Sequence, residues 1–280
     1  MGLWERTSSL VFNAEGPPLA ATANFLAPTI TKLELLRNEH RLSSATGFFL
    51  KVEGSWYLVS NWHVLSGRSP LTGQSLQRTG ATPSHCRFFT IDLRGNSLVR
   101  EPHLLPLGDP CEGNATWFEH PVLRQDVDVG VLPLLDIVPG KAKDLLDPTG
   151  HDPTMWIDLG AELFLPGYPL GIEAPAGLAI WKRASLATST EFGEGMDRKV
   201  LVDTASREGM SGSPCLAVAN WRYYSLDRTT GKMKIVDRPL SHRLLGVYSG
   251  RLNAKDRQST GQNARRGGDH GHLPRAFLQQ

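Results

Sequence analysis

Short runs of apolar and β-branched residues recur along most of the chain, and stretches rich in glycine, proline and aspartate separate them. Strand-like runs at 45–51 and 55–60 flank the turn sequence Val52-Glu53-Gly54, a pattern typical of a β-hairpin. Many short strands joined by polar turns indicate a β-sandwich or β-barrel. The pattern therefore predicts an all-β fold, with further strands at 86–91, 127–134, 162–165, 178–186, 200–202, 215–218 and 243–249.

A polar, turn-rich stretch at residues 139–153 lies between two blocks of predicted strands. Its proline, glycine and charged residues are typical of a linker, so we expect it to join two β lobes. Before the first lobe, residues 34–41 are expected to form a short helix. The predicted organisation is an N-terminal segment, a first lobe, a linker, a second lobe and a polar, flexible tail, at residues 1–43, 44–138, 139–153, 154–252 and 253–280.

Composition and charge exclude several classes of protein. The 280 residues are 40% hydrophobic and 21% charged, which is enough to bury a sizeable core. Thirty basic and 28 acidic residues give a net charge of +2, so we expect no binding to nucleic acid or to an anionic membrane. No apolar run reaches the roughly 18 residues of a membrane span, and the N-terminal residues lack the basic-then-apolar pattern of a secretory signal.

The three cysteines, Cys86, Cys111 and Cys215, are too few and too widely spaced for a disulfide framework or a zinc site. We therefore expect three reduced thiols in a cytoplasmic protein. The sequence also contains no phosphate-binding glycine loop and no zinc-binding helix motif. No metal or other cofactor is expected.

Residues that suit hydrolytic chemistry occur in the chain order histidine, aspartate, serine. His63 directly follows an apolar strand, and Asp128 begins another one. Ser211 lies in a tight turn between Gly209 and Gly212, just before a further apolar strand. A serine hydroxyl is a poor nucleophile at neutral pH unless a base lies within hydrogen-bonding distance. Imidazole is a suitable base, and a carboxylate on its other nitrogen fixes the tautomer.

Two alternatives bear on this assignment. Asp126 lies near Asp128, but Asp128 is the one followed by a glycine and apolar residues, so we favour Asp128 as the partner of His63. The turn around Ser211 is not the nucleophile elbow of α/β-hydrolases, because Ser213 stands where that motif needs glycine. The pattern predicts acyl-transfer chemistry at Ser211.

Taken together, these motifs resemble those of the trypsin-like serine peptidase superfamily, in particular its bacterial, disulfide-free branch. The resemblance covers about residues 44 to 251. The motifs that carry it are Thr46-Gly47-Phe48, Asn61-Trp62-His63-Val64, Asp128-Val129-Gly130-Val131-Leu132, Gly167-Tyr168-Pro169-Leu170-Gly171, Gly209-Met210-Ser211-Gly212-Ser213-Pro214 and Gly246-Val247-Tyr248-Ser249-Gly250.

The resemblance implies two six-stranded-type antiparallel β-barrels, the first with His63 and Asp128 and the second with Ser211. It implies a serine endopeptidase that acts on a protein or peptide through an acyl-enzyme, with the amides of Gly209 and Ser211 as the oxyanion hole. The implied pocket for the residue before the cut is lined by Ala205, Ser206, Tyr248, Ser249, Gly250 and Arg251. Because Ala205 replaces the acidic residue of trypsin, small or medium uncharged residues are expected there. The alternative is that the Arg251 guanidinium turns inward, in which case acidic residues would be accepted.

Two points remain open at this level. After Arg251 the sequence offers no convincing strand, so the second barrel is expected to be incomplete at its C-terminus or closed by an atypical arrangement. This departure keeps an alternative function in view, a non-catalytic trypsin-like module that binds a peptide in the same cleft. The sequence also leaves open whether a regulatory partner protein completes or gates the site.

Overall fold

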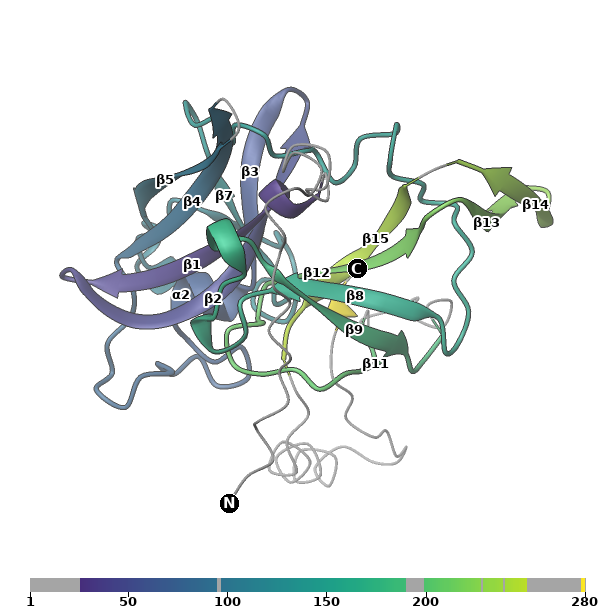
Figure 1. Cartoon of the computed structure of the whole chain (residues 1–280). Coiled ribbons are helices and arrows are strands. Elements are labelled where there is room, and N and C mark those ends of the chain that lie inside the picture. Colours follow the sequence, from purple (N-terminus) through teal and green to yellow (C-terminus); the bar gives the residue numbers. More distant parts are fainter. Residues whose placement is uncertain are drawn as a thin grey trace, which may run out of the picture.

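The computed structural model describes residues 26–94, 97–189, 199–227, 229–238, 240–250 and 278–279. The strands form two seven-stranded antiparallel sheets, one in each lobe, and a separate two-stranded ribbon (Figure 1). This confirms the predicted all-β class, with antiparallel sheets and few helices. None of the helices in the described ranges is long and apolar enough to cross a membrane.

The first sheet has the strand order β5-β4-β1-β2-β3-β7-β6. Its inward-facing side chains come from nearly every strand and meet in one apolar core around Phe49, Leu58, Phe88 and Leu132. Burial of such side chains is the main favourable contribution to folding of the lobe. The strands are β1 (Ile30–Arg37), β2 (His40–Val52), β3 (Ser55–Ser60), β4 (His85–Arg94), β5 (Ser97–Pro106), β6 (Phe118–Glu119) and β7 (Gly130–Pro133).

The expected helix at residues 34–41 is wrong. This stretch contains the end of β1, a turn at Asn38 and Glu39, and the start of β2. Both turn residues have positive φ, at 47° and 68°, and such a turn suits a tight β-hairpin. β1 pairs with β2 on one side and with β4 on the other, and these long-range partners override the local helix propensity.

The second sheet has the order β10-β16-β15-β12-β8-β9-β11. Leu163, Leu165, Met210, Cys215 and Tyr248 lie in its core. Its strands are β8 (Glu162–Gly167), β9 (Ile180–Leu186), β10 (Lys199–Val200), β11 (Val202–Asp203), β12 (Pro214–Ala219), β15 (Ser241–Tyr248) and β16 (Leu278–Gln279).

Strand β16 comes from the segment in which the sequence shows no convincing strand. It pairs antiparallel with Val247 and Tyr248 of β15 and with β10. Two residues are too few to show an alternating pattern, so only the neighbouring strands define this one. Arg251 and Leu252 of the second lobe, the predicted tail up to residue 277, and residue 280 lie outside the described residues.

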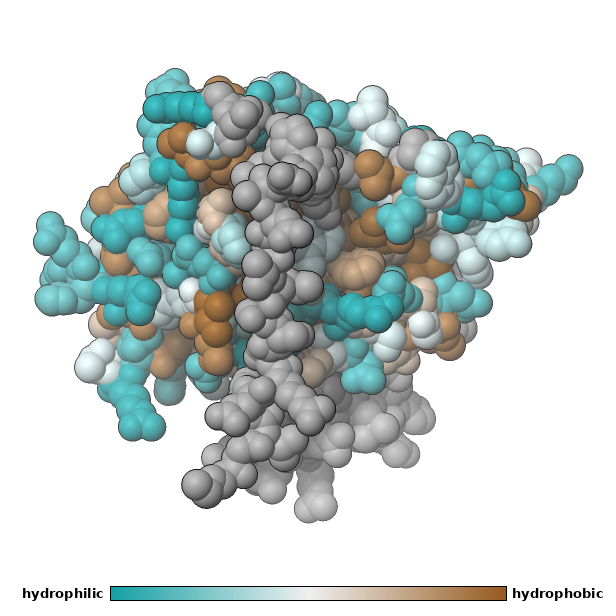
Figure 2. Space-filling view, in the orientation of Figure 1, coloured by the Kyte–Doolittle hydropathy of each residue, from teal (hydrophilic) through white to brown (hydrophobic). Residues whose placement is uncertain are grey.

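The remaining elements are short. β13 (Arg222–Asp227) and β14 (Lys232–Asp237) form the ribbon that extends from the second lobe in Figure 1. The helical turns are η1 (Ala27–Thr29), α2 (Trp62–Ser66), η2 (Pro110–Glu112), η3 (Pro169–Gly171) and η4 (Pro175–Gly177). On the face shown in Figure 2, hydrophilic residues predominate and smaller apolar areas lie between them, as is usual for a protein surface.

A third apolar cluster joins the lobes. Ile30, Phe48 and Val59 of the first lobe pack with Tyr168 and Val247 of the second. Leu145, from the stretch predicted as a linker, is fully buried in the same cluster. The two lobes therefore meet over a packed interface, and the candidate site lies along it.

All three cysteines are free. Cys86 is buried in the first core and Cys215 in the second, whereas Cys111 is exposed. Burial raises the pKa of the Cys86 thiol to about 12, because the low-dielectric core disfavours the thiolate. Cys86 is therefore a packing residue.

Candidate active site

The pairing of β3 with β7 brings His63 and Asp128 together. Ser60 lies opposite Gly130 in this antiparallel pair. His63 lies three residues after Ser60, and Asp128 lies two residues before Gly130. Both therefore lie at the same end of the two strands. Residues that are 65 apart in sequence become neighbours through this register.

The helical turn α2 presents His63 to the cleft. It begins after Asn61 and ends at Gly67, which has φ 66° and whose N–H donates to the His63 carbonyl. The Asn61 side chain is fully buried, and its Nδ2 donates to the backbone carbonyl of Asp128 at 2.8 Å. Trp62 and Leu65 are buried in the core of the first lobe. The Asn61 hydrogen bond and the buried side chains of Trp62 and Leu65 thus hold the turn in place, while His63 stays partly exposed.

The Asp128 carboxylate is buried and accepts hydrogen bonds on both oxygens. Oδ1 accepts from the backbone N–H of His63 at 2.9 Å, and Oδ2 lies 2.7 Å from His63 Nδ1. The Ser249 hydroxyl also donates to Oδ2. A carboxylate at Nδ1 keeps the ring proton there, so Nε2 of the neutral ring is free to act as a base.

Ser249 is a partner of Asp128 that sequence reasoning assigned only to the substrate pocket. Its position directly after β15, in the motif Gly246–Gly250, is the only sequence signal that points to it. Asp126, the alternative aspartate, is exposed at a turn in which its N–H donates to Leu123. The structure therefore places Asp128, and not Asp126, beside His63.

Ser211 lies in a turn that packs against the first lobe. Gly212 has φ 85°, and a Cβ there would overlap the Thr46 carbonyl oxygen and the Ser60 hydroxyl, so only glycine fits. The Ser211 carbonyl accepts from the N–H of Thr46 at 2.9 Å. This bond joins the serine turn to β2, which in turn pairs with β3 next to His63.

The backbone N–H groups of Gly209 and Ser211 point away from the segments that hold this turn. The Glu208 carbonyl accepts from Leu170 N–H at 2.6 Å, and the Met210 carbonyl accepts from Ser213 N–H at 3.0 Å. In a trans peptide the N–H points opposite to the C=O, so the amides of Gly209 and Ser211 point the other way. Within the described ranges neither amide donates a hydrogen bond. They form a pair of donors of the kind that an oxyanion hole needs.

Gly209→Ala tests this loop directly. Gly209 has φ 89°, and a Cβ there would overlap the Tyr168 carbonyl oxygen, so the loop has to shift. If the loop serves as an oxyanion hole, kcat is expected to fall by roughly 10²–10³, the loss typical of one missing oxyanion donor. Steady-state kinetics on a peptide substrate measures this effect. Gly73→Ala, at another positive-φ glycine with open space around it, serves as the control and should keep wild-type kcat.

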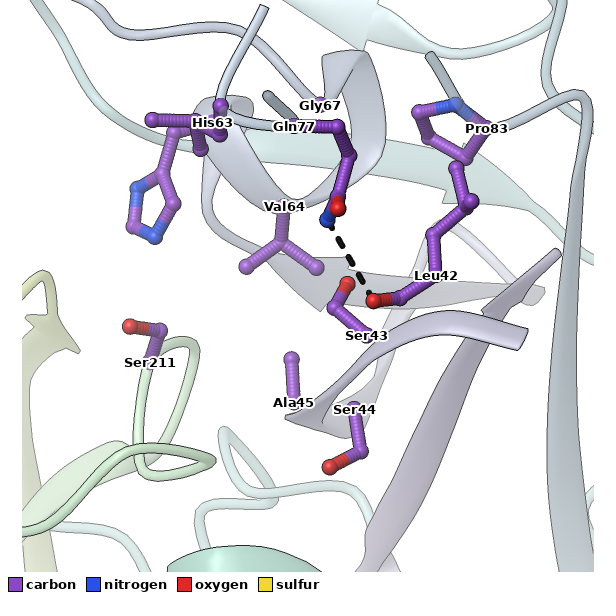
Figure 3. Close-up of a pocket in the computed structure, with 11 residues that line it drawn as sticks. Leu42, Ser43, Ser44, Ala45, His63, Val64, Gly67, Gln77, Pro83 and Ser211 are labelled. Carbon is purple, nitrogen blue, oxygen red and sulfur yellow. Dashed lines mark hydrogen bonds between the residues drawn. The ribbon is translucent and has the colours of Figure 1, made fainter. Parts of the chain in front are cut away.

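A cavity of about 130 Å³ opens beside the two catalytic candidates (Figure 3). In this view the His63 ring extends toward Ser211, and the two side chains lie at the same side of the cavity. No hydrogen bond joins these two side chains, both of which the structure describes. Catalytic hydrogen bonds are often long without substrate. The other lining residues are Leu42, Ser43, Ser44, Ala45, Val64, Gly67, Leu76, Gln77 and Pro83.

The residues predicted to line the specificity pocket differ in their exposure. Ala205 is exposed, whereas Ser206 and Tyr248 are buried, and their hydroxyls form a hydrogen bond of 2.5 Å. Gly212 N–H donates to the Tyr248 carbonyl, so Tyr248 lies next to the Ser211 turn. Ser249 and Gly250 follow it and are partly exposed. Arg251 lies outside the described residues.

Comparisons with known proteins give distant structural similarities only. The chain is similar to Rv3671c from M. tuberculosis H37Rv, solved as a mutant in an inactive form, with a TM-score of 0.38, 14% identity, and coverage of 92% of this chain and 94% of that one. It is also similar to the serine endoprotease from Yersinia pestis, with a TM-score of 0.40, 11% identity, and coverage of 82% and 62%. No family model matches the sequence, and no curated protein matches it. Both similarities occur at low sequence identity.

The arrangement has the parts that acyl transfer requires. It combines a hydroxyl on a fixed turn, an imidazole whose far nitrogen is held by a buried carboxylate, and two outward-facing amides. Such a set can deprotonate a serine and stabilise a tetrahedral oxyanion without any added group.

Proposed function

We propose that this protein is a serine endopeptidase that cleaves peptide bonds through an acyl-enzyme on Ser211. The observation that carries the proposal is the buried Asp128 carboxylate, which accepts two hydrogen bonds from His63 beside the cavity that Ser211 also lines. A buried charge is costly unless it is well paired, and here its partner is a histidine that lines the same cavity as the serine. A protein or peptide is the expected substrate.

The chemistry follows from these positions. Ser211 Oγ attacks the carbonyl carbon of the scissile bond while His63 Nε2 accepts the hydroxyl proton. The carbonyl oxygen becomes an oxyanion and accepts from the amides of Gly209 and Ser211. His63 then donates its proton to the leaving nitrogen, and the acyl-enzyme remains. Water attacks this ester with His63 as base, which releases the acid and restores Ser211.

We also infer that each seven-stranded sheet curves into a barrel. The support is that side chains from β1, β2, β3, β4 and β7 converge on one core in the first lobe, and those from β8, β9, β12 and β15 converge on one core in the second. A flat sheet could not direct one face of so many strands at a common centre.

Labelling with a fluorophosphonate probe tests the proposed function. The probe phosphonylates only a serine that is activated by a base, so wild-type protein is expected to become labelled and Ser211→Ala is expected not to. Intact, folded wild-type protein that takes up no probe and cleaves no peptide would instead support a non-catalytic module that holds a peptide in the same cleft. Binding of peptides to Ser211→Ala would then be measured.

The hydrogen bond between Ser206 and Tyr248 supports a restricted specificity. In the proposed mechanism His63 protonates the leaving group, so the leaving group lies on the side of Ser211 where His63 lines the cavity. The acyl group then lies on the opposite side of Ser211, between residues 205–209 and 248–250. The two buried hydroxyls are satisfied by each other, and Ala205 offers no carboxylate for a basic side chain. A cationic residue would enter that space unpaired, which is unfavourable.

A peptide library analysed by mass spectrometry should therefore show cleavage after small or medium uncharged residues. Tyr248→Val shortens the side chain and should raise cleavage after larger apolar residues by about 10- to 200-fold relative to wild type. Tyr248→Phe keeps the ring and should not. Efficient wild-type cleavage after lysine or arginine would contradict this specificity.

A further inference from the structure

The turn η3 controls the orientation of one amide in the candidate oxyanion hole. Leu170 N–H donates to the Glu208 carbonyl at 2.6 Å, and this bond turns the Gly209 amide toward the cleft. Leu170 has φ 55°, and Gly171 N–H closes the turn on the Tyr168 carbonyl at 2.9 Å. The motif Gly167–Gly171 is thus the support behind the 208–209 peptide.

Directly after this turn, Glu173 forms ion pairs with two cations of the first lobe. Lys32 Nζ on β1 lies 2.9 Å from Oε1, and Arg100 Nη1 on β5 lies 2.8 Å from Oε2. The Lys32 side chain is only 11% exposed. The Arg100 guanidinium also stacks on the Phe89 ring, with its central carbon 3.4 Å from the ring centroid. Both cations are therefore held in place around one carboxylate.

The charge on Glu173 is present at neutral pH. Burial raises the pKa of its carboxyl, but the hydrogen bonds and charges of Lys32 and Arg100 outweigh burial, and the net pKa lies below the ordinary value. The carboxylate is thus a permanent link between the first lobe and the segment that follows η3.

We propose that Glu173 is a positioning residue for the oxyanion hole, which fixes η3 to the first lobe and so keeps the Gly209 amide turned into the site. The inference rests on the proposed function. The other half of the loop already has a first-lobe anchor, since Thr46 donates from Oγ1 to the Gly209 carbonyl at 2.8 Å. Tyr168 holds the start of η3 to the first lobe through Thr46 and Ile30, and Glu173 adds an ionic anchor at the end of the turn.

Loss of this carboxylate has a specific consequence. Glu173→Gln leaves Lys32 and Arg100 without a counterion at the lobe interface, where their repulsion is poorly screened. The start of η3 stays attached to the first lobe, because Tyr168 N–H donates to Thr46 Oγ1 at 3.1 Å and the Tyr168 hydroxyl donates to the Ile30 carbonyl at 3.2 Å. The end of the turn loses its ionic link, so the Leu170–Glu208 bond fixes the peptide less firmly. An oxyanion donor acts mainly in the transition state, so kcat and kcat/KM fall together while KM stays nearly constant.

The test compares Glu173→Gln with Glu34→Gln. Glu34 is a matched control, because it also lies between two cations, Arg87 at 3.1 Å and Arg41 at 3.7 Å, but links strands only within the first sheet. Active sites are counted by fluorophosphonate titration, and kcat and KM are measured per active site. Affinity for a peptide boronic acid, which forms a tetrahedral adduct with the serine, reports on the oxyanion hole. Hydrogen exchange of peptides covering 168–172 and 207–213 reports on the turn.

For Glu173→Gln we expect a fall in kcat of about 10- to 100-fold, below the roughly 10²–10³ for complete loss of a donor. Boronate affinity should weaken by the same factor, and exchange at Leu170 should accelerate. Glu34→Gln should leave all three unchanged. If Glu173→Gln does not fold, Arg100→Gln removes one of the two ion pairs and should show the same effects to a smaller degree.

Wild-type kcat and wild-type exchange in folded Glu173→Gln would overturn the inference, as would an equal loss in Glu34→Gln. Failure of the proposed function gives a different result, since the wild-type protein would then neither react with the probe nor cleave peptides. In that case the exchange measurement alone still decides whether Glu173 holds η3, and unchanged exchange would overturn the inference.

Discussion

Ser211→Ala is expected to lower kcat by roughly 10⁶, and His63→Ala should lower it by a similar factor. The nucleophile and its base act as one unit, so removing either leaves the other without a function. The double variant should therefore be little worse than each single one. Activity that remains, roughly 10³–10⁴ over water, would come from binding and from the amides of the 209–211 loop.

Kinetics on one peptide substrate with purified, folded variants measures these effects, and circular dichroism checks the fold. Ser55→Ala, at an exposed position at the start of β3, is the control and should keep wild-type kcat. If the Ser211 and His63 losses multiplied in the double variant, the two residues would not act together, and the proposed mechanism would be wrong.

Asp128→Asn is expected to leave the fold intact and to lower kcat by roughly 10⁴. The carboxylate oxygen at 2.7 Å from Nδ1 keeps the ring proton on that nitrogen. An asparagine side chain can present its NH₂ group there instead, which moves the ring proton to Nε2 and removes the lone pair that faces Ser211. Ser249 and the His63 amide both have Asp128 as their acceptor, so the side chain cannot simply turn away.

Asp126→Asn is the matched control for this variant, because it makes the same change two residues away at an exposed turn. It should have wild-type kcat, and thermal unfolding of both variants should stay close to wild type. A large loss in Asp126→Asn together with a harmless Asp128→Asn would mean that the wrong aspartate has been assigned to His63.

The local pattern of residues was sufficient to predict the fold class. Short apolar runs between glycine, proline and aspartate turns have few stable solutions other than antiparallel sheets, because each strand must bury one face. Candidate residues were also readable, since Ser211 sits between two glycines and His63 and Asp128 flank apolar strands. These signals are local, so they survive without any knowledge of long-range contacts.

The helix expected at 34–41 shows where local reasoning failed. Leu35 and Leu36 suit a helix in isolation, but β2 and β4 provide backbone partners on both sides, and these partners decide the structure. Strand β16 is the opposite case, because two residues have no detectable pattern and become a strand only between β15 and β10.

Only the tertiary structure decided how the site is supported. The register of β3 against β7 places Asp128 on His63, and the end of β15 brings Ser249 to the same carboxylate. Likewise, the anchors of the 208–211 loop come from Thr46 and from the turn before Glu173, which are far away in sequence. Hydrogen bonds and ion pairs act over a few ångströms in space, so the sequence can supply the residue types while only the packed lobes bring the partners within reach.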